Sequence, residues 1–102
     1  MEHIILSSDG PLYVYAVPDE VAWHLEEYCK EFTESGIWKL IAANYDGVSY
    51  ADDAVCFSEQ SFVLYLNEYL FPNQKSWRVA DLGYISHKKI PKKYRDCPRY
   101  NF

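Results

Sequence analysis

Hydrophobic and polar residues alternate near the N-terminus in the way that predicts a β-hairpin. Residues 4–6 form an apolar run, residues 7–11 carry the serine, aspartate, glycine and proline typical of turns, and residues 12–17 form a second β-prone run. Successive side chains of a strand point to opposite faces of the sheet. The aliphatic face would hold Leu12, Val14 and Ala16, and the mostly tyrosine face would hold Tyr13, Tyr15 and Val17.

A helix is predicted to follow, from Pro18 to the residue before Gly36. Proline suits a helix start, and Asp19 and Glu20 would lie in the first turn, where the helix dipole favours carboxylates. Apolar residues then recur with the period of an α-helix, which indicates one buried stripe. The stripe consists of Val21, Leu25, Tyr28, Cys29 and Phe32. Gly36 is a favourable stop because glycine accepts left-handed backbone angles.

The middle of the chain has two interpretations. Residues 37–43 predict a strand, which would turn at Asp46-Gly47 into a short strand over 48–50. A helix over 37–44 is the alternative, because the lysine, leucine and alanines of this stretch favour helix. A further short strand is expected at 55–57.

A second helix and a last strand are predicted beyond this region. Ser58 is a good N-cap for a helix that runs to about Leu70 and ends before Pro72. Residues 77–80 predict the last strand, and residues 81–83 a turn that leads the chain out of the sheet.

The remaining segment, residues 86–102, is basic and aromatic. Pro91 and Pro98 exclude a long helix or a central strand there. We therefore expect a single two-layer α+β domain over residues 1–85, with two helices and a mostly antiparallel sheet of four to five strands in the order ββα-ββα-β. The extended tail, residues 86–102, is expected to pack on the same domain or on a neighbouring chain.

Charge is segregated along the sequence. Residues 1–70 carry a formal charge of −11 and residues 71–102 a formal charge of +6, which leaves −5 overall. Halves of opposite sign either attract each other within the fold or present two surfaces to partners.

The aromatic content of 18% makes the uncovered face of the sheet important. Two helices on one face would leave the other open, and we expect Tyr13 and Tyr15 on that open face. Because large aromatic patches are rarely left bare, the tail is expected to cover them as a strap, with its cations compensating the acidic body. The strap would use Ile90, Tyr94, Tyr100 and Phe102. A homodimer through the same face is the alternative.

The first predicted helix also carries an unusual tryptophan. On the helical wheel Trp23 falls opposite the apolar stripe, among glutamates. Such a side chain either packs under another segment or anchors an interface, since tryptophan is a common hot-spot residue. The expected partner-binding residues are Trp23, Glu20, Glu27, Tyr13 and Tyr15. The glutamates would steer a basic partner onto the buried rings.

Single-stranded nucleic acid is an alternative ligand of the tail. Its cations could pair with phosphates while its rings stack on bases. The residues concerned are Lys92, Lys93, Tyr94, Arg95, Arg99 and Tyr100. The acidic chain, with a sequence pI near 5.0, disfavours this alternative.

Cysteine, histidine and glycine patterns indicate little chemistry. Cys29, Cys56 and Cys97 are odd in number and widely spaced, which is typical of a reducing, cytoplasmic environment. No signal peptide, membrane span, metal site or cofactor is expected, because none of the corresponding motifs is found. A small thiol-dependent enzyme is a further alternative, since Cys56 precedes a helix start. With no catalytic motif, we expect a non-enzymatic protein-interaction or regulatory module that binds a protein partner or itself.

Overall fold

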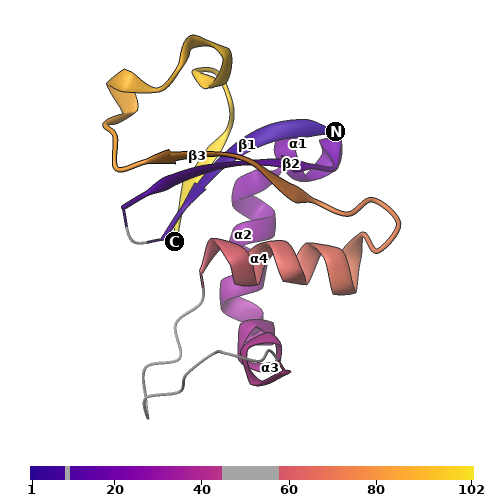
Figure 1. Cartoon of the computed structure of the whole chain (residues 1–102). Helices are drawn as coiled ribbons and strands as arrows, with labels where there is room; N and C mark the ends of the chain where they lie inside the picture. The colour runs from indigo at the N-terminus through magenta and orange to yellow at the C-terminus, as the bar shows by residue number, and fades with distance from the viewer. Residues whose placement is uncertain (9, 45–57) are drawn as a thin grey trace.

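A four-stranded sheet in the order β3-β2-β1-β4 forms the centre of the molecule (Figure 1). The computed structural model describes residues 1–8, 10–44 and 58–102. The strands are β1 (Glu2–Ser7), β2 (Leu12–Val17), β3 (Trp77–Gly83) and β4 (Arg99–Asn101). Strand β2 pairs antiparallel with β1 and β3, whereas β4 pairs in parallel with β1. The α+β class is confirmed, but the sheet is mixed and its strand order includes the C-terminal segment.

The predicted N-terminal hairpin is confirmed. Its register places Ile4 opposite Tyr15 and Ile5 opposite Val14. The turn favours glycine at position 10, because Gly10 has a φ of +113°. The exposed Tyr84 ring lies close by, and a Cβ atom at position 10 would displace it.

The predicted helix between Pro18 and Gly36 is divided in two, α1 (Asp19–Trp23) and α2 (Leu25–Ser35). The break lies at His24, whose φ of −126° and ψ of 37° are not helical. The apolar stripe is buried as predicted, with Tyr28 half-buried. Helix α2 ends at Gly36, which has a φ of +75°.

The strand prediction for residues 37–43 is wrong, because helix α3 (Ile37–Asn44) occupies this stretch and the alternative prediction is correct. The N–H group of Lys39 donates to the Gly36 carbonyl oxygen at 3.0 Å, which starts the new helix at the glycine turn. The local preference for helix therefore prevails. The turn and strands expected between residues 46 and 57 lie outside the described residues.

Helix α4 (Glu59–Tyr65) begins at Ser58 as predicted. The Ser58 hydroxyl accepts from the Ser61 N–H group, and the Ser61 hydroxyl accepts from the Ser58 N–H group, which forms a capping box. The chain continues as a π-helical turn, η1 (Leu66–Leu70), before Pro72.

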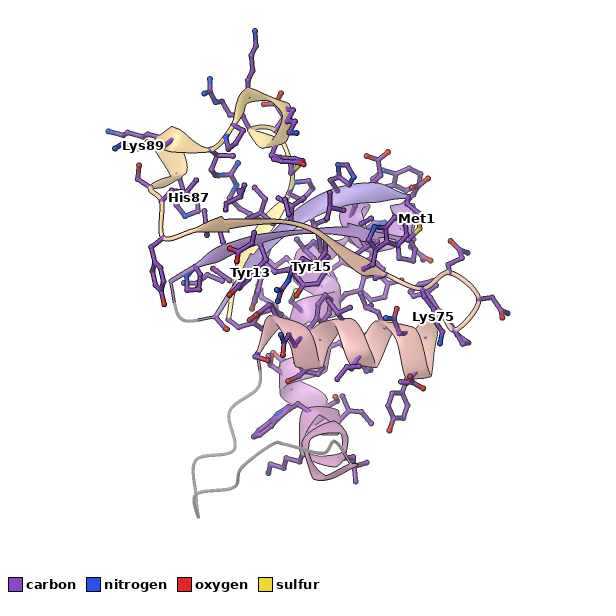
Figure 2. All side chains as sticks on the ribbon, viewed as in Figure 1. Met1, Tyr13, Tyr15, Lys75, His87 and Lys89 are labelled. Atoms are coloured by element: carbon purple, nitrogen blue, oxygen red, sulfur yellow. The ribbon has the colours of Figure 1, made fainter. Side chains whose placement is uncertain are left out.

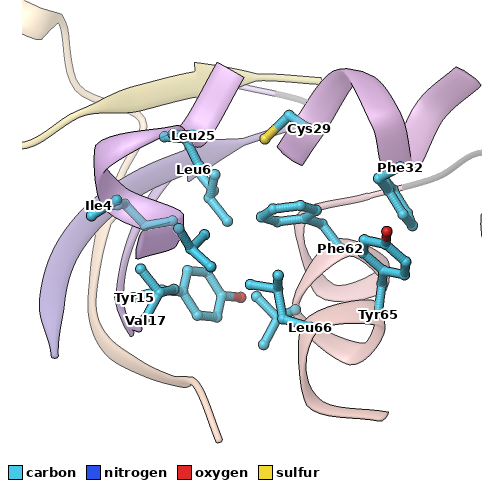
Figure 3. Close-up of a cluster of buried hydrophobic side chains, with 13 residues drawn as sticks. Ile4, Leu6, Tyr15, Val17, Leu25, Cys29, Phe32, Phe62, Tyr65 and Leu66 are labelled. Atoms are coloured by element: carbon cyan, nitrogen blue, oxygen red, sulfur yellow. The ribbon is translucent and has the colours of Figure 1, made fainter. Parts of the chain in front are cut away.

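Two groups of buried side chains lie on opposite faces of the sheet. The larger group fills the space between the sheet and the helices (Figure 3). It includes Ile4, Leu6, Tyr15, Val17, Cys29, Phe32, Phe62 and Leu66. The smaller group consists of Ile5, Leu12, Val14, Ile90 and Tyr94. The predicted alternation of β2 is therefore right, but the helices cover the tyrosine face rather than the aliphatic one.

The prediction that Tyr13 and Tyr15 lie on an open face is accordingly wrong. Tyr15 is only 4% exposed, and Tyr13 is half-buried. A tyrosine ring can enter a core when its hydroxyl finds a partner, and the Tyr15 hydroxyl accepts a hydrogen bond from Arg78 at 3.4 Å.

The C-terminal segment covers the aliphatic face instead. It contains two short 3-10 turns, η2 (His87–Lys89) and η3 (Lys92–Tyr94). Ile90 is 0% exposed and Tyr94 is 7% exposed, because both pack on the second group of buried side chains. We call residues 85–97 the strap. Strand β4 then joins the sheet edge, so Tyr100 and Phe102 pack on the helix side rather than on the strap side.

Candidate functional site

Much of the acidic and basic charge lies on opposite sides of the sheet. The acidic helices α1 and α2 pack on one face, and the strap, which carries most of the C-terminal cations, lies beyond the other (Figures 1 and 2). Within the described residues the ion pairs are Met1–Asp19 and Lys30–Glu26, and the His24 ring lies beside the Glu27 carboxylate. None of them joins a cation of residues 71–102 to a carboxylate. The expected compensation of the acidic body by the tail cations is therefore not made through ion pairs in this part of the chain, and the acidic helices and the basic strap form two oppositely charged surfaces.

An acidic hollow of about 290 Å³ lies at the junction of α1 and α2. It is lined by Glu20, His24, Glu27, Tyr28 and Glu31, and we call this set the acidic hollow. His24 Nδ1 lies 3.7 Å from Glu27 Oε1. Burial, followed by the charge of Glu20, raises the pKa of the Tyr28 hydroxyl, so this group stays a neutral donor at physiological pH.

Trp23 is 70% exposed, one residue before the His24 break. Of the two predicted environments, packing under another segment is therefore excluded among the described residues. The break also separates Trp23 on α1 from Glu27 on α2, so they do not share one continuous helical wheel. The structure still brings Glu20 and Glu27 to one hollow. His24, the residue after Trp23, lines the same hollow.

Tyr13 and Tyr15 belong to a different location, where Arg78 joins them from β3. The Arg78 guanidinium carbon lies 4.2 Å from the centre of the Tyr13 ring and 5.8 Å from that of the Tyr15 ring. The hydrogen bond to the Tyr15 hydroxyl raises the pKa of Arg78 further. Burial raises the pKa of Tyr15. This cluster was missed from the sequence, although two tyrosines two residues apart on one strand and an arginine on a neighbouring strand are a recognisable signal.

The predicted nucleic-acid residues of the tail have mixed environments. Lys92 and Lys93 are exposed, but the Tyr94 ring of the strap is buried against the sheet and Tyr100 is half-buried. The arginines are used internally, since Arg95 donates to the Ile90 carbonyl and Arg99 to the Arg95 carbonyl. Rings for base stacking are therefore not presented beside the lysines.

The described thiols are poor nucleophiles. Burial raises the pKa of Cys29 far above its usual range, and it also raises the pKa of the half-buried Cys97. Cys56 lies outside the described residues. No group of three or more possible metal ligands occurs in the described ranges. Over the same residues, no helix is both long and apolar enough to cross a bilayer.

Compared with models of known families, with curated proteins and with solved structures, the chain has no match.

Proposed function

We propose that this chain is a cytoplasmic, non-enzymatic interaction module that binds a basic segment of a protein partner at the acidic hollow, with Trp23 as the anchoring side chain. One observation carries the proposal. Trp23 is 70% exposed and directly precedes His24, which lines a hollow together with glutamates, and no lysine or arginine of the described residues pairs with those glutamates.

The chemistry of the surface favours a cationic partner. Glu20, Glu27 and Glu31 provide negative charge around a concave surface, and they belong to residues 1–70, which carry a formal charge of −11. Such a surface accelerates the encounter with a positively charged segment, and salt weakens that effect. Trp23 adds a large apolar ring that loses water when a partner covers it.

The strap of the same molecule does not occupy the hollow, because it packs on the opposite face of the sheet. A separate protein is therefore the proposed partner. A second copy of the chain is a competing source of cations, since Lys88, Lys89, Lys92 and Lys93 are exposed. Sedimentation of the purified protein at low salt distinguishes a separate partner from self-association. Only self-association would make the measured mass rise as the protein concentration rises.

A labelled peptide rich in lysine and arginine is the direct probe, and an acidic peptide of equal length is its control. Fluorescence anisotropy at low salt should show saturable binding of the basic peptide only. Trp23→Ala, and separately Glu20→Gln combined with Glu27→Gln, should each lower the affinity about tenfold or more. Trp77→Ala is the matched control, because Trp77 is also 54% exposed but lies on β3. Equal binding by all variants, or no binding at low salt, contradicts the proposal.

A further inference from the structure

A second concave surface lies between the edge strand β3 and helix α4. It has a volume of about 360 Å³ and is lined by Tyr15, Gln60, Val63, Leu64, Ser76 and Trp77 together with Arg78. We call it the Arg78 groove. It lies away from the acidic hollow, whose lining residues all come from α1, α2 and the His24 junction.

Arg78 is held in a fixed position beside this groove. Its guanidinium group lies over the Tyr13 ring, and Tyr15 accepts one of its hydrogen bonds. Figure 2 shows Tyr13 and Tyr15 extending from β2 toward α4. Irregular pairing between β2 and β3 also contributes, because Val14 pairs with Ala80 and Tyr15 with Arg78, which leaves Val79 as an extra residue. Bulges of this kind redirect a neighbouring side chain and are frequent beside binding sites.

The Arg78 guanidinium group forms few polar interactions with the rest of the protein. Among the described residues the Arg78 side chain forms no ion pair, and its only hydrogen bond is the one to the Tyr15 hydroxyl. A guanidinium group has five N–H donors in a planar fork that matches a carboxylate. Together with the hydrogen bond to Tyr15, the charge of the buried Glu59 contributes to the raised pKa of Arg78. Glu59 does not line the groove, however, and its carboxylate accepts a hydrogen bond from Ser8. Arg78 therefore retains donors for an external anion.

The apolar lining of the groove indicates an organic rather than an inorganic anion. Val63 and Leu64 supply an apolar wall, and Trp77, which is 54% exposed, supplies a flat ring. Ser76 is 6% exposed, and its hydroxyl oxygen is buried without a hydrogen-bond partner within the described part of the chain. Buried hydroxyl groups are normally satisfied, so this residue of the groove wall has an unmet hydrogen bond.

We propose that the Arg78 groove binds a small aromatic carboxylate. The carboxylate would accept hydrogen bonds from Arg78, and the aromatic ring would lie against Leu64 and Trp77. The volume is within the range of small-ligand sites, which combine an apolar lining with a few placed polar groups.

Cinnamate is the test ligand, cinnamamide is its neutral counterpart, and inorganic phosphate is the anion without a ring. Titration of the full chain, followed by tryptophan fluorescence and by calorimetry, should show saturable binding of cinnamate. Cinnamamide and phosphate should each bind at least about tenfold more weakly, because each lacks one of the two recognised groups. Equal affinity for cinnamate and cinnamamide, equal affinity for phosphate, or no binding of cinnamate overturns the proposal.

Variants locate the site. Arg78→Gln should lower cinnamate affinity about 10- to 100-fold, which is the usual effect of losing charge-assisted hydrogen bonds. Lys75→Gln removes the same charge from the loop before β3 and should leave the affinity unchanged. Gln60→Trp, which fills the groove from the exposed surface of α4, keeps the test valid if Arg78→Gln does not fold. Undiminished cinnamate binding by Gln60→Trp contradicts the assignment.

Discussion

The side chains of Ser7 and Asn101, which are 94 positions apart, are joined by a hydrogen bond of 2.9 Å from Ser7 Oγ to Asn101 Oδ1. The same two residues are paired in the parallel register of β1 and β4. The next residue continues the connection, because the Phe102 N–H group donates to the Ser7 carbonyl oxygen at 2.8 Å. The C-terminal residues are therefore a structural part of the sheet.

We predict that this connection stabilises the whole domain. In a double-mutant cycle, Ser7→Ala and Asn101→Ala should each lower the free energy of unfolding, with a coupling of about 0.5–1.5 kcal/mol for the shared hydrogen bond. Phe102→Ala should cost about 2 kcal/mol, less than full burial would give, because its half-buried ring packs against Phe32 and Phe62. Urea denaturation measures each value. If the losses in free energy of unfolding for Ser7→Ala and Asn101→Ala simply add in the double variant, the hydrogen bond contributes nothing.

The second prediction concerns the strap. Ile90 is fully buried against the aliphatic face of the sheet, so Ile90→Ala should lower the free energy of unfolding by about 2–5 kcal/mol. Ile90→Val, which removes one methyl group, should cost about 0.5–1.5 kcal/mol. Thermal and urea denaturation give both values.

Lys89→Ala is the control for the strap, because Lys89 is the exposed neighbour of Ile90. Its effect should stay within about 0.5 kcal/mol of zero. Equal stability of Ile90→Ala and Lys89→Ala would mean that the strap does not cover the sheet in solution.

The local elements of the fold were largely predictable, whereas their long-range arrangement was not. Turn residues and alternation define the hairpin, and Ser58 and Pro72 define the second helix, because these signals act within a few residues. The break at His24 has no proline or glycine to indicate it. Strand β4 has only three residues, and its partner lies at the other end of the chain. Parallel pairing at that separation leaves no local pattern in the sequence.

In the candidate sites, too, local groupings of residues were predictable and contacts between distant segments were not. The acidic hollow was partly predictable, since Glu20 and Glu27, about two turns apart, fall on one side of the predicted helix. The position of Tyr15 was not, because a tyrosine is suited both to an exposed face and to a core where its hydroxyl has a partner. The partner is Arg78 on β3, and only the register between β2 and β3 brings the two together. Sequence alternation fixes which residues share a face but not which face the helices cover.

The last prediction concerns stability at alkaline pH. Cys29 is 0% exposed, and burial raises the pKa of its thiol, so the folded protein retains a proton that the unfolded chain releases above about pH 8.5. The stabilisation is therefore complete below that pH and declines as the pH rises toward the folded-state pKa. Each such group lowers the free energy of unfolding by about 1.4 kcal/mol per pH unit in this window. The buried hydroxyl of Tyr15, whose pKa is also raised, adds to the decline from about pH 10.

Cys29→Val removes one titrating group while keeping a small apolar side chain at the buried position. The free energy of unfolding should be measured by urea denaturation at pH 7, 8, 9 and 10. Above about pH 8.5 it should fall with pH less steeply than in the wild type, by about 1.4 kcal/mol per pH unit, which is the effect of one titrating group. Cys97→Val should change the slope less, because Cys97 is only half-buried and Arg99 opposes the rise in its pKa. An unchanged slope in Cys29→Val would mean that the Cys29 thiol ionises as readily in the folded protein as in the unfolded chain, and that the core between α2 and α4 admits water.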